Sequence, residues 1–129
     1  MHDNDVVTIR LRCCAMTLAL VAIAGCDNRF AEDVGSGISI ERGKLLVDQY
    51  QCGTCHAIPG IPAARGTAGP PLQGFGRRSY IAGHIPNQPD LLAKWLIDPR
   101  AMVPSTTMPS MGVTPNDARD MAAYLHSLQ

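Results

Sequence analysis

The stretch Cys52-Gly53-Thr54-Cys55-His56 determines what this chain is expected to fold around. Its C-x-x-C-H spacing is the attachment signature of a c-type haem. Two thiols three positions apart on a short helical turn can each add to one vinyl group of a porphyrin. The histidine that follows then presents a neutral imidazole, a good iron ligand, from the same side. We therefore expect one covalent haem on Cys52 and Cys55, with His56 as an axial ligand of the iron.

The segment that precedes this motif has the features of an export signal. Two arginines come before an apolar run at residues 13–24, which is shorter than the roughly twenty residues that span a bilayer as a helix. Residues 23–26, Ile-Ala-Gly-Cys, resemble the lipobox of bacterial lipoproteins. We expect a lipoprotein signal peptide at residues 1–25 and lipidation of Cys26. A plain signal peptide with a soluble product, or an uncleaved span, are the alternatives.

The residues after the lipobox indicate a location and a linker. Asp27 resembles the signal that retains some lipoproteins in the inner membrane. A Gly-Ser-Gly run and acidic residues then predict a flexible, lipid-anchored linker over residues 26–38. Several acyl chains on Cys26 would anchor the chain stably. We expect the domain of residues 39–129 to lie on the periplasmic side of the bacterial inner membrane.

Composition limits the class of protein. A chain of 129 residues forms one small domain rather than two, and only 5% of its residues are aromatic. Few large side chains are therefore available to fill the core, and a buried porphyrin would supply the missing apolar volume. The formal net charge is zero and no nucleic-acid motif is present, so we expect no nucleic-acid partner.

The cysteine count favours haem over two other uses of paired thiols. Of five cysteines, Cys13 and Cys14 leave with the signal peptide and Cys26 takes the lipid. Only the pair in the C-x-x-C-H motif remains. A zinc ribbon would need a second C-x-x-C, and a thioredoxin-like redox pair would need a βαβ pattern around the motif. The sequence has neither.

The predicted fold is all-α, with three or more helices and loops wrapped around one covalent haem. Residues 58–88 and 99–113 are rich in Gly and Pro and lack strand alternation. Such long irregular stretches in a compact domain require a group that organises them, and a haem is such a group. The helices are expected to run from the cap residue Ser39 to about Gln49, from Pro89 to Pro99, and from the cap residue Thr114 to the chain end.

The second axial ligand decides what the haem can do. A thioether opposite histidine raises the reduction potential and closes the iron to small ligands, whereas an open position allows gas binding or peroxidase chemistry. Met102, Met108 and Met111 lie in the Pro-rich loop, where a side chain can reach the iron. Met121 lies in the apolar stripe of the last predicted helix and is expected to pack in the core.

Residues 40–128 resemble a class I monohaem cytochrome c of the bacterial lipoprotein type. The run at residues 95–109, from Trp to Met-Pro, is similar without a gap to the helix, Pro turn and ligand loop of that family. The resemblance places the axial methionine on Met108, with Met111 as the first alternative and Met102 as the second.

Two further roles are implied by the same resemblance. The Gly-Pro-Pro-Leu run at residues 69–72 is similar to a family loop in which the carbonyl of the first proline accepts a hydrogen bond from the free ring N–H of the ligating histidine. Pro70 would fill that role and fix the His56 imidazole. The family's propionate-binding arginine corresponds to Arg77 or Arg78, and the spacing does not choose between them.

The function expected from motif and resemblance is single-electron transfer rather than enzymatic catalysis. The sequence resembles cytochrome modules associated with bacterial terminal oxidases. We therefore expect the chain to donate electrons to a terminal oxidase or another respiratory complex, or to form part of it. A haem c subunit of a dehydrogenase complex is one alternative. An enzyme or sensor with an open coordination site is another.

Overall fold

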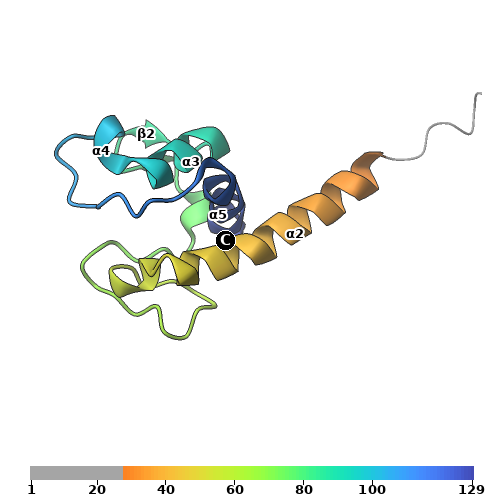
Figure 1. Ribbon diagram of the computed structural model, residues 1–129, viewed down its shortest axis with the longest axis horizontal. Helices are drawn as coiled ribbons and strands as arrows, with labels where there is room; N and C mark the ends of the chain where they lie inside the picture. Colours follow the sequence, from red (N-terminus) through yellow and green to blue (C-terminus); the bar gives the residue numbers. More distant parts are fainter. Residues whose placement is uncertain (1–27) are drawn as a thin grey trace, which may run out of the picture. The chain divides into compact units, whose positions relative to one another are not determined.

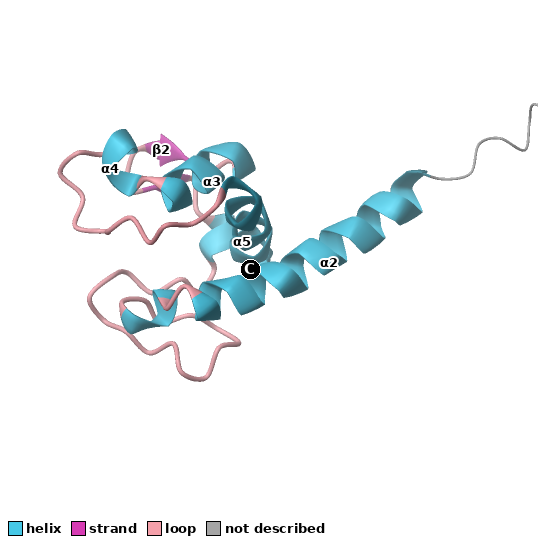
Figure 2. Cartoon of the chain, viewed as in Figure 1, coloured by secondary structure: helices cyan, strands magenta, loops and turns pink. Residues whose placement is uncertain are grey.

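The computed structural model describes residues 28–129, and the compact unit that carries the site spans residues 33–129 (Figure 1). This part of the chain is mostly helical, as predicted, with short 3-10 turns and one two-stranded ribbon (Figure 2). No helix among the described residues is both long and apolar enough to cross a membrane. The elements are α2 (Asn28–Gln49), η1 (Cys52–Thr54), η2 (Phe75–Arg77), β1 (Tyr80–Ile81), β2 (Ile85–Pro86), α3 (Pro89–Ile97), α4 (Pro99–Met102) and α5 (Pro115–Ser127).

Helix α2 begins eleven positions before the expected cap residue Ser39, at Asn28. Residues 28–38, where a flexible linker was expected, are helical in the structure. Each glycine in this segment costs about 1 kcal/mol relative to alanine in a helix. Extending an existing helix, however, adds one hydrogen bond per residue without a new nucleus. The predicted lipidation site Cys26 and the signal peptide of residues 1–25 lie outside the described residues.

Helices α2 and α5 cross in backbone contact at Gly43. A Cβ at this position would overlap the carbonyl of Asp120 and lie 3.0 Å from the amide nitrogen of Met121. Only glycine leaves the space for this approach. Leu46 and Val47, one turn further along α2, are buried in the core. The crossing therefore fixes the end of α2 that leads into the C-x-x-C-H motif.

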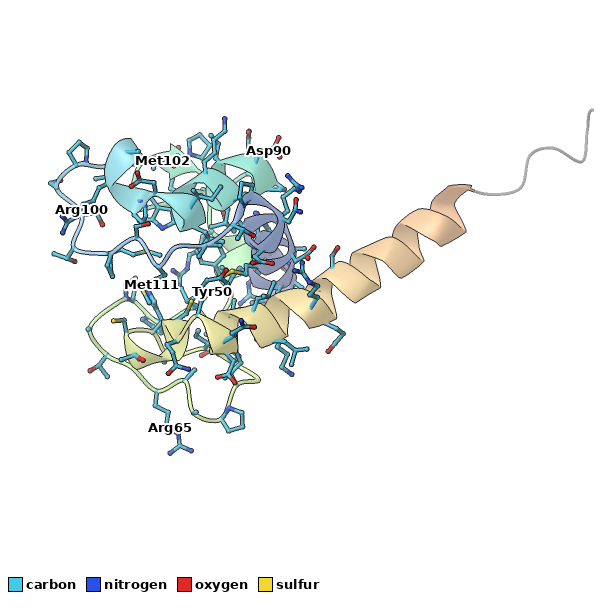
Figure 3. All side chains as sticks on the ribbon, in the orientation of Figure 1. Tyr50, Arg65, Asp90, Arg100, Met102 and Met111 are labelled. Carbon is cyan, nitrogen blue, oxygen red and sulfur yellow. The ribbon has the colours of Figure 1, made fainter. Side chains whose placement is uncertain are left out.

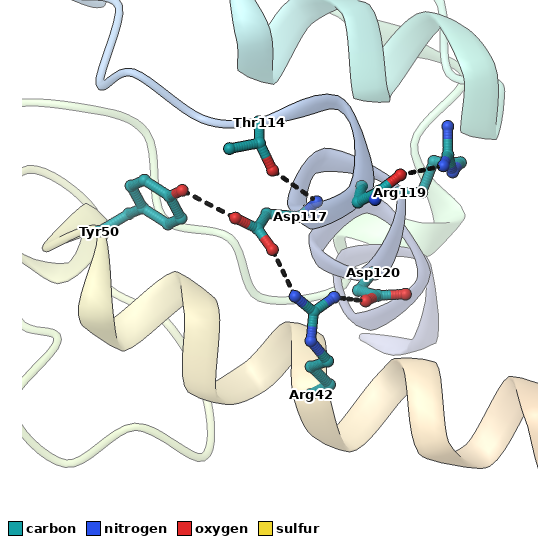
Figure 4. Close-up of polar contacts among 7 residues, drawn as sticks. Arg42, Tyr50, Thr114, Asp117, Arg119 and Asp120 are labelled. Carbon is teal, nitrogen blue, oxygen red and sulfur yellow. Dashed lines mark hydrogen bonds and ion pairs between the residues drawn. The ribbon is translucent and has the colours of Figure 1, made fainter.

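A polar cluster joins the same two helices (Figure 4). Arg42 forms ion pairs with Asp117 and Asp120, and the Tyr50 hydroxyl donates to the Asp117 carboxylate at 2.9 Å. The hydrogen bond from Tyr50, with those from Thr114 and Arg42, holds the pKa of Asp117 below its ordinary value. Because the Arg42 side chain is about half exposed, these ion pairs orient the helices more than they stabilise the fold.

Helices α3 and α5 pack against each other and form the centre of the core. Pro89 occupies the first turn of α3, as predicted. The Thr114 hydroxyl accepts a hydrogen bond from the Asp117 amide at 3.2 Å, which confirms the predicted cap of α5. Both helices bury an apolar stripe. These buried side chains are Leu92, Ala93, Trp95 and Leu96 on α3, and Ala118, Met121, Ala122, Tyr124 and Leu125 on α5.

The structure adds regular elements inside the two stretches that were expected to be irregular. Pro99 ends α3 but also starts the extra turn α4, where the Asp98 carboxylate accepts from the Ala101 amide at 3.1 Å. Proline fits a first turn because that position needs no N–H donor. Strands β1 and β2 pair antiparallel, with Ile81 opposite Ile85. Four paired residues carry too little alternation to be detected in the sequence.

Candidate functional site

A cavity of about 500 Å³ lies within the compact unit and is lined by residues of both loop regions as well as helices α3 and α5. The yellow-green loop after η1 and the blue loop at residues 103–113, both visible in Figure 1, each contribute lining residues. This volume is typical of a site for a cofactor-sized ligand. The wall is mainly apolar and includes Val47, Leu72, Phe75, Ile81, Leu92 and Leu96.

The C-x-x-C-H motif forms a tight turn on the cavity wall. Gln51, in the left-handed conformation with φ 56°, lies between α2 and η1 and is the N-cap residue of η1. The amides of Cys55 and His56 then both donate to the Cys52 carbonyl, at 3.2 and 3.0 Å. This turn brings both free thiols and the imidazole to the same cavity, as the spacing predicted. Burial raises the pKa of the Cys52 thiol, which keeps it protonated in the unmodified chain.

The His56 imidazole is held by the segment at residues 69–70. Its Nδ1 lies 2.7 Å from the Pro70 carbonyl oxygen, the hydrogen bond that the resemblance implied. A carbonyl only accepts, so Nδ1 carries the proton and Nε2 keeps its lone pair free for a metal. A Cβ on Gly69 would overlap the imidazole ring. The 69–70 segment therefore fixes the position, orientation and tautomer of the predicted iron ligand.

Of the three loop methionines, the structure brings Met108 to the cavity. Met108 and the adjacent Pro109 line it, and the Met108 amide lies 3.2 Å from the Thr106 hydroxyl oxygen. Met102 on α4 and Met111 in the following loop, both labelled in Figure 3, are not among the lining residues. Met111 is 44% exposed.

Met121, by contrast, is fully buried on α5 and forms part of the cavity wall. This is the packing role that its place in the apolar stripe predicted. Trp95 is likewise buried and lines the cavity.

The two candidate arginines differ in their surroundings. Arg78 lines the cavity, whereas Arg77 is exposed and does not. The Arg78 guanidinium donates to the Pro71 and Gln73 carbonyls and lies 5.3 Å from the centre of the Phe75 ring. Of the two candidates, the structure thus brings Arg78 and not Arg77 to the cavity, a choice that spacing in the sequence did not make.

Several lining residues had no signal in the sequence. Phe75 and Thr106 come from the long Gly- and Pro-rich stretches, where no periodicity shows which side chains face inward. Phe75 is buried, while Tyr80 is 56% exposed at the edge of the cavity. A turn pattern predicts that the chain bends but not where a side chain points.

These groups fit a covalent haem. Two free thiols, an imidazole with one nitrogen available, a thioether and one guanidinium meet at a mainly apolar cavity. Thiols attach the porphyrin, nitrogen and sulfur are suitable iron ligands, and the guanidinium suits a carboxylate.

Comparison with known proteins gives the family. The cytochrome c family model matches residues 40–129, so the chain belongs to the cytochrome c family. Membership implies a covalently bound haem c, and electron transfer is the typical function of such a domain.

The curated relatives carry this domain within longer chains. The chain is 33% identical over 89 residues to cytochrome c oxidase subunit 2 of Alkalihalophilus pseudofirmus OF4, covering 68% of this chain and 25% of that protein. It is 36% identical over 83 residues to cytochrome c oxidase subunit 2 of Bacillus sp. PS3, covering 60% of this chain and 23% of that protein. The chain thus spans about a quarter of the length of these relatives. No solved structure matches it.

Proposed function

We propose that this cytochrome c is a single-electron carrier whose haem iron is ligated by His56 and Met108. The observation that carries the proposal is the composition of one cavity wall. His56 and Met108 line the same cavity as both thiols, and the other two loop methionines do not. The haem supplies a reversible one-electron couple when bound.

The chain's own residues would support this role in three ways. The Pro70 carbonyl accepts a hydrogen bond from Nδ1–H of His56 and so fixes the imidazole with Nε2 free for the iron. The apolar wall excludes water and lowers the local dielectric constant. The Met108 thioether would close the second axial position, so that no substrate binds at the metal.

We further propose that the electrons pass to a terminal oxidase, either as a separate partner or as the complex of which this chain is a part. Two relatives named as oxidase subunits, each similar over most of this domain, support the proposal. Lipidation of Cys26, on the periplasmic side of the bacterial inner membrane, would keep the domain beside such a complex. Co-purification from the native membrane tests this. Recovery with a dehydrogenase and no oxidase would overturn it.

Absorption spectroscopy tests the ligation. The full chain, produced in a bacterial host that attaches c-type haem, is expected to give a low-spin spectrum with the weak far-red band of sulfur bound to ferric iron. Met108→Ala is expected to abolish that band and to open the iron to carbon monoxide, because the sixth ligand is lost. Met111→Ala serves as the matched control and should leave the spectrum unchanged. Loss of the band in Met111→Ala, with Met108→Ala unaffected, would contradict the assignment.

A further inference from the structure

Asn87 links the short segment between β2 and α3 to the turn η2. Its side-chain amide Nδ2 donates to the Phe75 and Arg78 carbonyls, each at 3.0 Å, and its backbone amide donates to the Ser79 carbonyl, also at 3.0 Å. The side chain is partly buried. Asn87 therefore holds three backbone positions in and after η2, although it lies 8 to 12 residues further along the chain.

The identity of this side chain is specific. Both acceptors are carbonyl oxygens, so only a group with two N–H donors and no positive charge satisfies them without an added ion. Aspartate of the same shape would place a carboxylate against two carbonyls. The amide thus bridges the two ends of the turn at Phe75–Arg77, in addition to the backbone hydrogen bond from the Gly76 amide to the Leu128 carbonyl.

The two residues whose carbonyls are clamped are also those whose side chains meet the cavity. Phe75 and Arg78 line it, and the guanidinium of Arg78 lies over the Phe75 ring at 5.3 Å. Arg78 is the single lysine or arginine among the lining residues. The Arg78 residue is half-buried, so its positive charge is less screened than one in bulk water, and its position affects the energy of adding an electron nearby.

We infer that Asn87 is a positioning residue that sets the Arg78 guanidinium against the haem and thereby raises the reduction potential. A fixed positive charge stabilises the electron-richer, reduced state. Releasing the η2 backbone would let the guanidinium move toward solvent, where water screens it. This inference rests on the proposed electron-carrier function but not on the identity of the sixth ligand.

A spectroscopic redox titration of the full haem-loaded chain tests the inference through a double-variant cycle. Asn87→Ala is expected to lower the reduction potential, and Arg78→Gln to lower it further. In the Arg78→Gln background, Asn87→Ala is expected to lower the reduction potential by less than half as much, because the guanidinium through which Asn87 acts is absent. The exposed neighbour Gln88→Ala is the matched control and should leave the potential unchanged.

Two outcomes overturn the inference. One is an Asn87→Ala protein with an unchanged potential, which would leave Asn87 a purely structural residue even if the variant melts earlier. The other is a fall in reduction potential on Asn87→Ala substitution that is equally large with Arg78 present and with Arg78→Gln. If Asn87→Ala does not accumulate with haem, Asn87→Ser retains one donor and is expected to give a smaller fall in the same direction; an unchanged potential there also overturns the inference. A high-spin wild-type spectrum would refute Met108 ligation and leave this cycle measurable.

Discussion

The two loops that face each other across the cavity are held by different means. On the His56 side, the amides of Gly66, Gly69 and Leu72 donate to carbonyls within residues 53–57, at 3.0, 2.8 and 2.8 Å. These bonds join segments that lie a dozen or more residues apart in the chain. The histidine side is therefore a backbone network that forms around the C-x-x-C-H turn.

On the Met108 side, the contacts of residues 103–113 are mainly local. The Thr106 amide donates to the Val103 carbonyl at 3.0 Å, and the Thr106 hydroxyl contacts the Met108 amide. A bond to a separate helix comes from the Ser110 hydroxyl, which donates to the Ile97 carbonyl at 2.9 Å. A ligand on such a loop can leave the iron with less disruption than one embedded in a backbone network. We therefore expect the loop that carries Met108 to open before the backbone network around His56 does.

The largest expected effect on stability comes from replacing one glycine on the His56 side, and a glycine on the Met108 side serves for comparison. Gly69→Ala places a Cβ inside the His56 ring, so we expect a loss of about 3 kcal/mol or more and a low yield of haem-loaded protein. Gly112→Ala meets no neighbouring atom and suffers only from its φ of 71°, at a cost of about 1–2 kcal/mol. Denaturant unfolding of both proteins measures the difference. Equal losses would show that the histidine side is no more tightly built than the methionine side.

A smaller effect is expected where the methionine loop joins α3. Ser110→Ala removes the hydrogen bond to Ile97 and should weaken the loop by about 1 kcal/mol. The far-red band is then expected to disappear at a lower temperature, while global unfolding changes less. Ser105→Ala, an exposed serine in the same loop, is the control. If the far-red band of Ser110→Ala disappears at the same temperature as that of the unmodified protein, packing rather than this hydrogen bond holds the loop.

The smallest effect concerns the polar cluster that joins α2 and α5. The pKa of Asp117 is lowered from 3.8, so its charged form is favoured by folding. That contribution is fully present above about pH 4 and is lost as the pH falls through the lowered folded-state pKa. Asp117→Asn should therefore reduce stability at neutral pH and lose this part of the acid dependence. Melting curves at neutral and acidic pH measure it, with the exposed Asp48→Asn as control; identical pH profiles for Asp117→Asn and the unmodified protein would contradict it.

Much of the fold followed from local sequence signals. The Thr114 cap, the first-turn prolines and the apolar stripes of α3 and α5 act over a few residues, and the structure has the predicted elements. The start of α2 was missed because weak helix formers can be carried by an adjoining stable helix. The α4 turn and the β1–β2 ribbon were missed because they are too short to have a period.

What the sequence alone determined about the site is the cluster at Cys52, Cys55 and His56, because a covalent attachment motif needs only neighbouring residues at one spacing. Which arginine lines the cavity, and which loop methionine lies beside it, was decided by the tertiary structure. Arg77 and Arg78 are neighbours in a turn, and one residue of rotation sends one side chain inward and the other to solvent. Such a rotation depends on distant partners such as Asn87, which no local pattern identifies.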